Sequence, residues 1–415
     1  MSNHSNFQQL GVSPKLVQVL NELKFVVPTP IQEKTIPEAI AGSDIIGIAQ
    51  TGTGKTLAFM LPMLEKIAKT KRMGLIVLPT RELAEQAQET LRRVGRQFNV
   101  KSALLIGGAS MGRQIEDLRR RPHVIVGTPG RINDHLQRRT LKLDQVGILV
   151  LDEADRMLDM GFAPQVQAIL THMPQNRQTL LFSATMPPAI ESIAAKYMKQ
   201  PKRIQTTQEG TVAEQVKQAL YIVPSHQKNR LLDKVLSDYS GTVLVFSRTK
   251  YGAKKLCRVV RNMKHTATEI HSNLSPAQRR RSLVGFKSGA YRVMVATDIA
   301  ARGIDVSEIE LVINYDLPDQ LSDYIHRVGR TGRAGEKGMA ISFVAPEQRR
   351  QIREIERLVR QRLPVAQLPD LPMERVQERE VYSEDGQSRG RRNYQQRRRN
   401  GGNGRRKFAP RRGQR

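Results

Sequence analysis

Residues 49–56 read AQTGTGKT and have the composition of a loop that wraps around phosphate groups. Gly52 and Gly54 allow backbone N–H groups to turn toward an anion at the start of a helix. Lys55 supplies a positive charge for the β- and γ-phosphates of a nucleotide, and the Thr56 hydroxyl is a suitable ligand for Mg²⁺. An apolar strand precedes this loop and the helical pattern LAFMLPMLEKIAK follows it, as such a loop requires. We therefore predict a nucleoside triphosphate site rather than a chance match, although the general pattern has Gly where Ala49 stands.

Residues 147–155 read GILVLDEAD and carry acidic side chains directly after a run of apolar residues. We expect Asp152 to hold Mg²⁺ through water and Glu153 to orient or deprotonate an attacking water. Acids at the end of a strand are usually only a solvated turn. The phosphate loop in the same chain favours the catalytic interpretation, so the two motifs together predict nucleotide hydrolysis.

The net charge indicates the kind of partner. The chain has 415 residues, a formal charge of +29 and 39% hydrophobic residues, which is enough for sizeable cores. A basic surplus of this size attracts polyanions and favours nucleic acid, with a merely soluble supercharged protein or a binder of anionic lipid as the alternatives. No apolar run approaches a membrane span, and the start of the chain lacks a signal-peptide pattern. A single cysteine, Cys257, excludes an intramolecular disulfide and a site of several thiolates, and it fits a reducing cytosol.

Short apolar runs alternate with helical patterns through most of the chain, which predicts parallel sheets flanked by helices. The strands expected in the first half are Ile45–Ala49, Leu75–Leu78, Ala103–Ile106, Val124–Val126, Ile148–Leu151 and Thr179–Phe182. Those expected in the second half are Ala219–Val223, Thr242–Phe246, Thr268–Ile270, Val293–Ala296, Leu311–Asn314 and Ala340–Val344. Two similar strand sets indicate two α/β domains, whose ligands should bind at the carboxyl ends of the strands.

These motifs resemble those of the DEAD-box RNA helicases from residue 7 to about residue 350. Asp152–Asp155 spell DEAD, and the family's motifs occur in order as FVVPTPIQ (25–32), AQTGTGKT, PTRELA (79–84), GG (107–108), TPGR (128–131), DEAD, SAT (183–185), VFSRT (245–249), ATDIAARGID (296–305) and HRVGRTGR (326–333). Each motif is weak alone, but ten in order are specific. The resemblance implies an α/β fold with two tandem RecA-like parallel-sheet domains and a disordered basic C-terminal tail.

The expected boundaries follow from this resemblance and from composition. Domain 1 spans residues 1–205, with an adenine-reading motif at 7–32, and a linker covers 206–216. Domain 2 spans 217–365, and a disordered Arg-rich RNA-binding tail covers 366–415. Within it, residues 386–415 hold eleven Arg, one Lys and no acidic residue, with nothing that could build a core.

The resemblance also implies an ATP site. Phe25 and Gln32 would read adenine, since an amide offers both a donor and an acceptor, and Phe7 would stack on the base, although Phe7 alone suggests a core residue. The family usually has Gly where Lys24 stands, so this turn is expected to differ slightly. The other expected ATP contacts are Ala49, Gln50, Thr51, Gly52, Thr53, Gly54, Lys55, Thr56 and, on the ribose, Asp305.

The same resemblance assigns chemistry and coupling. Arg330 and Arg333 would reach the γ-phosphate from the second domain, and His326 would link their motif to the acids. Arg327, Arg330 and Arg333 recur every three residues, which could also be a solvated basic face. The expected catalytic residues are Lys55, Asp152, Glu153, His326, Arg330 and Arg333, with Thr56 and Asp152 as metal ligands. Ser183, Ala184 and Thr185 would couple the ATP state to domain closure, since no base accompanies Ser183 to make it a nucleophile.

Three motifs of the first domain, PTRELA, GG and TPGR, share exposed backbone N–H groups beside an Arg or Thr. Such groups can bind a sugar-phosphate chain without reading its bases. Taken singly, such Gly-Pro turns are usually connectors. The resemblance assigns RNA to Pro79, Thr80, Arg81, Gly107, Gly108, Thr128, Gly130 and Arg131. In the second domain it assigns RNA to Arg248, Gln278, Arg281, Thr297 and Asp298.

The predicted function is that of an ATP- and Mg²⁺-dependent RNA helicase which clamps single-stranded RNA and separates short duplexes or remodels RNA–protein complexes. A DNA helicase of the same superfamily and an ATP-gated RNA clamp without unwinding are the alternatives. The short linker and basic tail suggest the bacterial RhlE-type subgroup. We expect a cytoplasmic protein without membrane contact, with ribosome or RNA-decay assemblies as possible partners.

Overall fold

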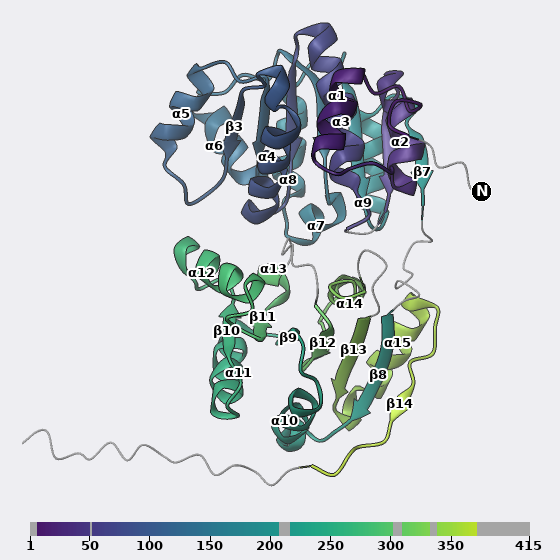
Figure 1. Cartoon of the computed structure of the whole chain (residues 1–415), viewed down its shortest axis with the longest axis vertical. Helices are drawn as coiled ribbons and strands as arrows, with labels where there is room; N and C mark the ends of the chain where they lie inside the picture. Colours follow the sequence, from purple (N-terminus) through teal and green to yellow (C-terminus); the bar gives the residue numbers. More distant parts are fainter. Residues whose placement is uncertain (1–5, 50–51, 207–215, 302–308, 333–337, 372–415) are drawn as a thin grey trace, which may run out of the picture. The chain divides into compact units, whose positions relative to one another are not determined.

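The computed structural model describes residues 6–49, 52–206, 216–301, 309–332 and 338–371. Its strands form two seven-stranded sheets, each belonging to one half of the chain, and every pairing is parallel. Helices flank both sheets (Figure 1). The predicted fold class of two tandem RecA-like α/β domains is confirmed.

The first domain contains strands β1 to β7 in the order β3-β4-β2-β5-β6-β1-β7. Its strands are β1 (Ile45–Ile48), β2 (Met73–Val77), β3 (Ser102–Leu105), β4 (Val124–Gly127), β5 (Val146–Leu151), β6 (Gln178–Ser183) and β7 (Lys202–Gln205). Its helices are α1 (Pro14–Glu22), α2 (Pro30–Ile40), α3 (Lys55–Thr70), α4 (Arg81–Val94), the 3₁₀ turn η1 (Arg96–Phe98), α5 (Met111–Arg119), α6 (Pro129–Gln137), α7 (Ala154–Asp159), α8 (Ala163–Thr171) and α9 (Pro188–Tyr197).

Two apolar cores hold this domain together, one on each face of the sheet. Helices α1 to α4 contribute to the first core, and α6 to α9 to the second. Strands β1, β4, β5 and β6 are buried along their whole length, as is typical of parallel strands covered on both sides. Their carboxyl ends consequently present loops at one common edge.

The second domain repeats this plan with strands β8 to β14 in the order β10-β11-β9-β12-β13-β8-β14. Its strands are β8 (Val216–Ile222), β9 (Val243–Phe246), β10 (Ala267–Ile270), β11 (Val293–Ala296), β12 (Leu311–Asn314), β13 (Gly338–Val344) and β14 (Val365–Ala366). Its helices are η2 (Ser225–Gln227), α10 (Lys228–Asp238), α11 (Lys250–Asn262), α12 (Pro276–Lys287), α13 (Asp298–Ala301), α14 (Leu321–Val328), η3 (Pro346–Gln348) and α15 (Arg349–Val359).

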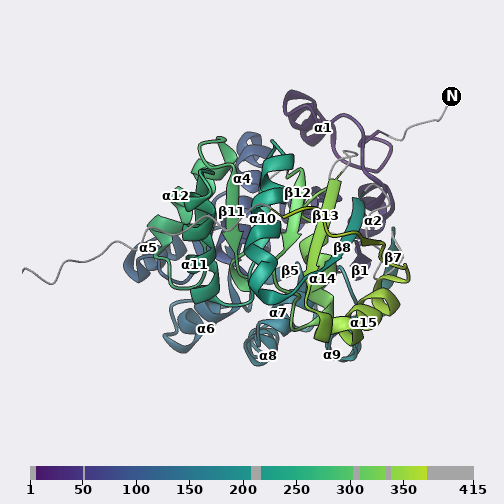
Figure 2. The ribbon, with the colours of Figure 1, turned by 90° about the horizontal axis from the view of Figure 1, so that it is seen from below.

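Helices α10 and α11 cover one face of the second sheet, as seen in Figure 2, and their apolar side chains pack on alternate residues of its strands. Helices α12 to α15 contribute to the core on the other face. None of the helices described in either domain is both long enough and apolar enough to cross a bilayer.

All twelve predicted strands are present; β11 and β12 have the predicted ends, and the ends of the other ten differ by up to three residues. Strands β7 and β14 were not predicted. They pair at the sheet edges with β1 and β8, and β7 exposes most of its side chains. The first sheet ends at Gln205, the predicted end of domain 1, and residues 207–215 of the predicted linker lie outside the described residues.

The described part of the second domain continues beyond residue 365. Ala366 belongs to β14, and the carbonyl of Leu371 accepts a hydrogen bond from Arg230 Nη2 at 2.9 Å. The first six residues of the predicted tail therefore have described structure, whereas residues 372–415 lie outside it.

Candidate active site

Residues 52–54 turn into the start of α3, as the phosphate-loop prediction requires. Gly52 and Gly54 both have φ of +91°, a backbone conformation that glycine adopts without strain. Lys55 is the first residue of α3, and its buried Nζ donates to the carbonyl oxygen of Ala49 at 2.9 Å. Its positive charge is thereby held against the backbone just after β1.

Gln32 connects the predicted adenine-reading motif to this loop. Its Nε2 donates to the carbonyl oxygen of Gly54 at 2.9 Å, and its Oε1 accepts from the backbone N–H of Thr29 at 2.9 Å. A Cβ on Gly54 would lie 2.6 Å from Gln32 Nε2, so glycine is required for this approach. The donor and the acceptor of the amide, which were together expected to read adenine, thus both have partners within the protein.

The two aromatic residues of the motif have different surroundings. Phe25 is 37% exposed, as a residue that contacts a base should be. Phe7 is 3% exposed and belongs to the first-domain core, which matches the alternative reading of this residue. Lys24 has φ of +63°, so the turn keeps a left-handed conformation that favours glycine, although the residue is lysine.

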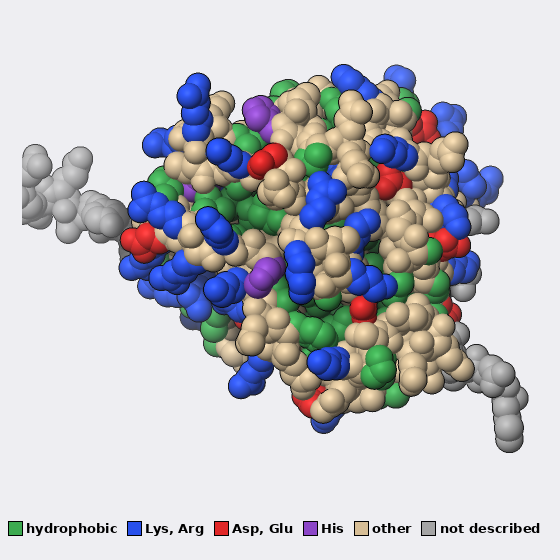
Figure 3. Space-filling model, turned by 90° about the horizontal axis from the view of Figure 1, so that it is seen from above, with side chains coloured by type: hydrophobic (Ala, Val, Ile, Leu, Met, Phe, Trp, Pro, Cys, Tyr) green, Lys and Arg blue, Asp and Glu red, His purple; other side chains and the backbone are tan. Residues whose placement is uncertain are grey.

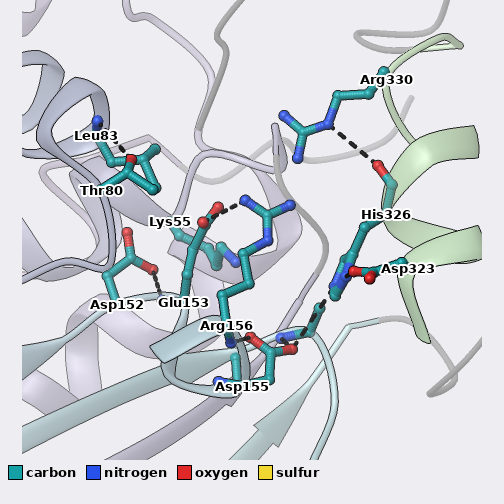
Figure 4. Close-up of polar contacts among 12 residues, drawn as sticks. Lys55, Thr80, Leu83, Asp152, Glu153, Asp155, Arg156, Asp323, His326 and Arg330 are labelled. Atoms are coloured by element: carbon teal, nitrogen blue, oxygen red, sulfur yellow. Dashed lines mark hydrogen bonds and ion pairs between the residues drawn. The ribbon is translucent and has the colours of Figure 1, made fainter. Parts of the chain in front are cut away.

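The acids after β5 are deeply buried beside positive charges (Figure 4). Burial raises the pKa of Asp152 to about 6, because Lys55 offsets the effect only in part and Glu153 adds to it. Burial also opposes ionisation of Glu153, but Arg156, Lys55 and Arg330 outweigh burial and hold its pKa at about 2. Glu153 is therefore an ionised carboxylate, and Arg156 donates directly to its Oε2.

Asp155 binds the SAT segment through four hydrogen bonds. Its Oδ2 accepts from the backbone N–H of Ala184 and Thr185 and from Thr185 Oγ1, at 3.0, 2.9 and 3.1 Å. Its own N–H donates to Ser183 Oγ at 3.1 Å. These are the three residues predicted to couple the ATP state to closure, and they contact the acidic motif as that prediction requires.

Two residues of the second domain approach these acids. His326 Nε2 lies 4.0 Å from Asp155 Oδ2, and Arg330 is among the charges that lower the pKa of Glu153. The Nε of Arg330 donates to the carbonyl oxygen of His326 at 3.2 Å, and its guanidinium points back toward the acids in Figure 4. Arg330 and His326 thus contribute to the same site as Lys55, Asp152 and Glu153.

The predicted RNA-binding residues of the first domain follow three adjacent strands, β3, β4 and β2. Arg81 lies against the glycine pair: a Cβ on Gly107 or Gly108 would come within 3.2 or 2.3 Å of its guanidinium. Arg131 Nη1 donates to the carbonyl oxygen of Ala109 at 3.1 Å. Thr80 caps α4, and its Oγ1 accepts from Leu83 N–H at 3.3 Å. Pro79, Thr128 and Gly130 lie at the same sheet edge, after β2 and β4.

In the second domain, Arg248, Gln278 and Arg281 are exposed at or near helix starts, and Thr297 is buried after β11. Gln278 also closes the cap of α12 with Ser275. Asp298 differs from the others, because both of its carboxylate oxygens accept hydrogen bonds from Arg327. Its charge is engaged within the domain. Arg327 itself is 1% exposed, so it is an internal residue rather than part of a solvated face.

Four predicted site residues lie outside the described residues: Gln50, Thr51, Asp305 and Arg333. The motif analysis missed two residues that the structure brings to the site. Arg156 stands three residues after Glu153, a spacing that allows contact on a helix. Arg279 of α12 donates to Glu82 of α4 at 2.9 Å, and it lies between the two α12 residues that were predicted.

The donor chemistry suits a magnesium ion. Asp152 is a buried carboxyl group with a raised pKa, so it lacks full charge compensation from protein groups. The half-buried Thr56 follows Lys55 at the start of α3. Hard oxygen ligands of this kind beside a phosphate loop are those that Mg²⁺ prefers.

Comparison with known proteins agrees with this geometry. Residues 29–193 match the family model for the DEAD/DEAH box helicase, and residues 227–335 match the helicase conserved C-terminal domain. The chain is 44% identical over 370 residues to the DEAD-box ATP-dependent RNA helicase CshA of Bacillus cereus (strain ATCC 10987 / NRS 248), covering 88% of this chain and 70% of the relative. It is 40% identical over 368 residues to CshA of Bacillus subtilis (strain 168), covering 88% and 74%.

Solved structures give the same result. Dbp5 of S. cerevisiae bound to RNA and ADP BeF3 superposes with a TM-score of 0.79 at 30% identity, covering 87% of this chain and 95% of Dbp5. Mss116p bound to ssRNA and AMP-PNP gives a TM-score of 0.80 at 26% identity, covering 88% and 80%. The predicted family is confirmed: the chain belongs to the DEAD-box ATP-dependent RNA helicases.

Proposed function

We propose that this chain hydrolyses ATP when single-stranded RNA is bound, and that it uses this cycle to separate short duplexes or remodel RNA–protein complexes. The observation that carries the proposal is the single cluster formed by Lys55, Glu153, Asp155, His326 and Arg330, which joins groups from both domains. A site divided between two domains can be complete in one relative position and incomplete in another. That property allows RNA binding to control hydrolysis.

The chemistry follows from the charges. Water attacks the γ-phosphorus, its proton passes to the ionised Glu153, and the bond to the β-phosphate oxygen breaks to give ADP and phosphate. Lys55 and Arg330 supply positive charge where negative charge develops on the phosphate. Magnesium, held through Asp152 and Thr56, would neutralise phosphate charge when bound. Arg156 keeps Glu153 ionised and holds its carboxylate in place.

The contacts of Asp155 support a role for this residue in coupling the two domains rather than in the hydrolysis step. Its oxygens are occupied by Ala184, Thr185 and Arg156, and His326 of the second domain lies nearby. A displacement of His326 would therefore change the contacts between Asp155 and the segment around Ser183. RNA would enter through Arg81, the glycine pair and Arg131, whose contacts require no particular base.

The finer assignments have different degrees of support. The RNA-bound relatives favour RNA over the DNA-helicase alternative. The relatives named CshA do not support the RhlE-type assignment. An ATP-gated clamp without unwinding stays the second candidate, because the same cluster would serve it. Adenine preference through Gln32 and Phe25, a cytoplasmic location, and ribosome or RNA-decay assemblies as partners belong to the proposal as predictions.

The test is Glu153→Gln. The amide cannot accept the proton from water, so ATP and RNA should bind normally while RNA-stimulated hydrolysis falls by at least about a hundredfold. Glu89→Gln is the matched control, since Glu89 is exposed on α4 and the same chemical change there should leave turnover unchanged. Near-normal hydrolysis by Glu153→Gln would remove Glu153 from this role.

Stimulation of the ATPase by single-stranded DNA as strong as by RNA would favour the DNA helicase. An assay of short-duplex release distinguishes a helicase from a clamp.

A further inference from the structure

Helix α11 carries an unusual surface that the proposed site does not use. It contains five basic residues and no acidic residue. Helix α12, which also lies next to the edge strand β10, contains four basic residues and no acidic residue. The apolar side of α11, formed by Ala253, Leu256, Cys257 and Val260, is buried against the sheet. Four of the five basic residues of α11 are exposed, namely Lys254, Lys255, Arg258 and Arg261, and Lys250 is half-buried.

The exposed side has a regular geometry. At about 100° per residue, Tyr251, Lys254, Lys255 and Arg258 fall within an arc of roughly 100° and a length of about 10 Å. We call these four residues the α11 face. All four are exposed, and Tyr251 is 70% exposed, the highest value among the large hydrophobic residues of the described chain. Lys250 Nζ lies 5.2 Å from the Tyr251 ring centroid, so a cation lies beside the aromatic ring.

The α11 face continues the predicted RNA path. Helix α11 begins at Lys250, two residues after Arg248, and Thr249 caps it by accepting from Gly252 N–H at 2.9 Å. Charges from α11 and α12 meet at the end of β10: burial lowers the pKa of His271, and Lys254, Arg279 and Lys250 lower it further against the opposing effect of Glu269. Basic side chains of α11 and of the start of α12 thus lie close to one another, although Glu269 lies among them and Arg248 Nε is 3.3 Å from Asp319 Oδ1.

On the face drawn in Figure 3, basic side chains are widely spread and acidic ones are few, so a general positive field does not distinguish one surface from another. The α11 face is distinguished by an exposed aromatic ring on a helix that carries several cations and no acidic residue of its own. Such a combination suits unpaired nucleotides, whose bases stack on aromatic rings while phosphates contact cations. A duplex keeps its bases stacked on each other and would leave Tyr251 unused.

We propose that the α11 face binds the single-stranded RNA that extends beyond the grip of Arg248, Gln278 and Arg281, with Tyr251 stacked on a base and the three cations on phosphates. This inference rests on the proposed function, because it assumes that RNA binds at the second domain. It adds a length requirement: RNA longer than the clamp should bind more tightly than RNA that only fills it.

The test compares two single-stranded RNAs, the shortest that fully stimulates the ATPase and the same sequence extended on both sides. In a variant with Lys254→Gln, Lys255→Gln and Arg258→Gln, the extended RNA should lose its advantage. Its log–log salt dependence should fall by about two, since each of three phosphates contributes roughly 0.7. Tyr251→Ala should weaken the extended RNA roughly tenfold, the effect of one lost stacking contact, whereas Tyr251→Phe should bind normally. The short RNA should give unchanged half-maximal concentrations throughout, which also reports correct folding.

The matched control removes the same charge from α15 through Arg350→Gln, Arg353→Gln and Arg357→Gln. These arginines are also exposed, but α15 packs against α14 at another part of the domain (Figure 1). Equal losses in the two triple variants would mean that only total charge matters, and would overturn the inference. An extended RNA that binds no tighter than the short one would also overturn it. Failure of any RNA to stimulate the wild-type ATPase would instead refute the proposed function itself.

Discussion

The buried pair of Glu153 and Arg156 leads to a quantitative prediction about the stability of the first domain. Their side chains are 4% and 2% exposed. Relative to the ordinary value of 4.5, a Glu153 pKa of about 2 corresponds to roughly 3 kcal/mol of stability at neutral pH. Because the pKa is lowered in the folded state, this stability is present above pH 4.5 and is lost as the pH falls toward 2.

Arg156→Met removes the cation that lowers this pKa most, while Lys55 and Arg330 still face the carboxylate. We expect the free energy of unfolding to fall by about 3 kcal/mol, the lower end of the range for breaking a buried ion pair. Adding Glu153→Gln to Arg156→Met should restore much of the loss, since a neutral amide no longer needs the cation. The double-mutant cycle should therefore show a coupling of about 2 kcal/mol or more.

The assay is urea unfolding of the nucleotide-free protein at neutral pH, followed by circular dichroism because the chain has no Trp. The first-domain transition should be fitted separately, since two domains need not unfold together. Arg72→Met is the control: Arg72 Nη1 and Nη2 bind the backbone oxygens of Asn176 and Val146, each at 2.8 Å, so its cycle with Glu153→Gln should be additive within about 0.5 kcal/mol. An additive cycle for Arg156 as well would refute the view that Arg156 keeps Glu153 ionised.

Three further predictions concern other parts of the chain. The raised pKa of Asp152, about 6, means that this carboxyl gains a proton as the pH falls through 6. Magnesium-dependent ADP binding should therefore weaken from pH 7 to pH 5 in titrations with and without a chelator. Because the terminal phosphate of ADP also gains a proton at about pH 6, Asp152→Asn should reduce this pH dependence and leave the part that the nucleotide causes. Lys24→Gly should raise the free energy of unfolding by roughly 0.5–1 kcal/mol, because Lys24 has φ of +63°, whereas a similar gain from Lys24→Ala would contradict this reason. Deleting residues 386–415 should lower the slope of log affinity for RNA against log salt concentration by about four, if half of the tail charges bind RNA. The RNA concentration for half-maximal ATPase should rise, while the rate at saturating RNA stays within about twofold. Equal salt slopes with and without these residues would contradict RNA capture by the tail.

Much of the fold was predictable because parallel strands buried on both faces are continuous apolar runs. Strands β11 and β12 match their predicted bounds residue for residue. The edge strand β7 has the sequence KRIQ with mostly exposed side chains, and it is fixed by backbone pairing with β1. Strand β14 has only two residues. Neither contains a pattern of side chains that could reveal it.

The site was predictable where a motif determines the local backbone, as at Gly52, Gly54 and Lys55. The site was less predictable where the partner of a side chain is distant in the sequence and is brought close only by the fold. The bidentate contact of Asp298 with Arg327 joins residues 29 positions apart, and no spacing rule indicates it. The burial of Phe7 depends likewise on the packing of α1 and α3, which a residue type alone does not give.

The contact between Gln32 and Gly54 has a consequence for how the wrong nucleotide would be rejected. The residue expected to sense the base also holds a carbonyl of the predicted phosphate-binding loop. A purine that displaces the Gln32 amide would disturb that carbonyl, and with it the start of α3 where Lys55 stands. The wrong nucleotide would then be hydrolysed slowly even at saturation, in addition to binding more weakly. Other nucleoside triphosphates that occupy the site in a cell would therefore seldom be hydrolysed.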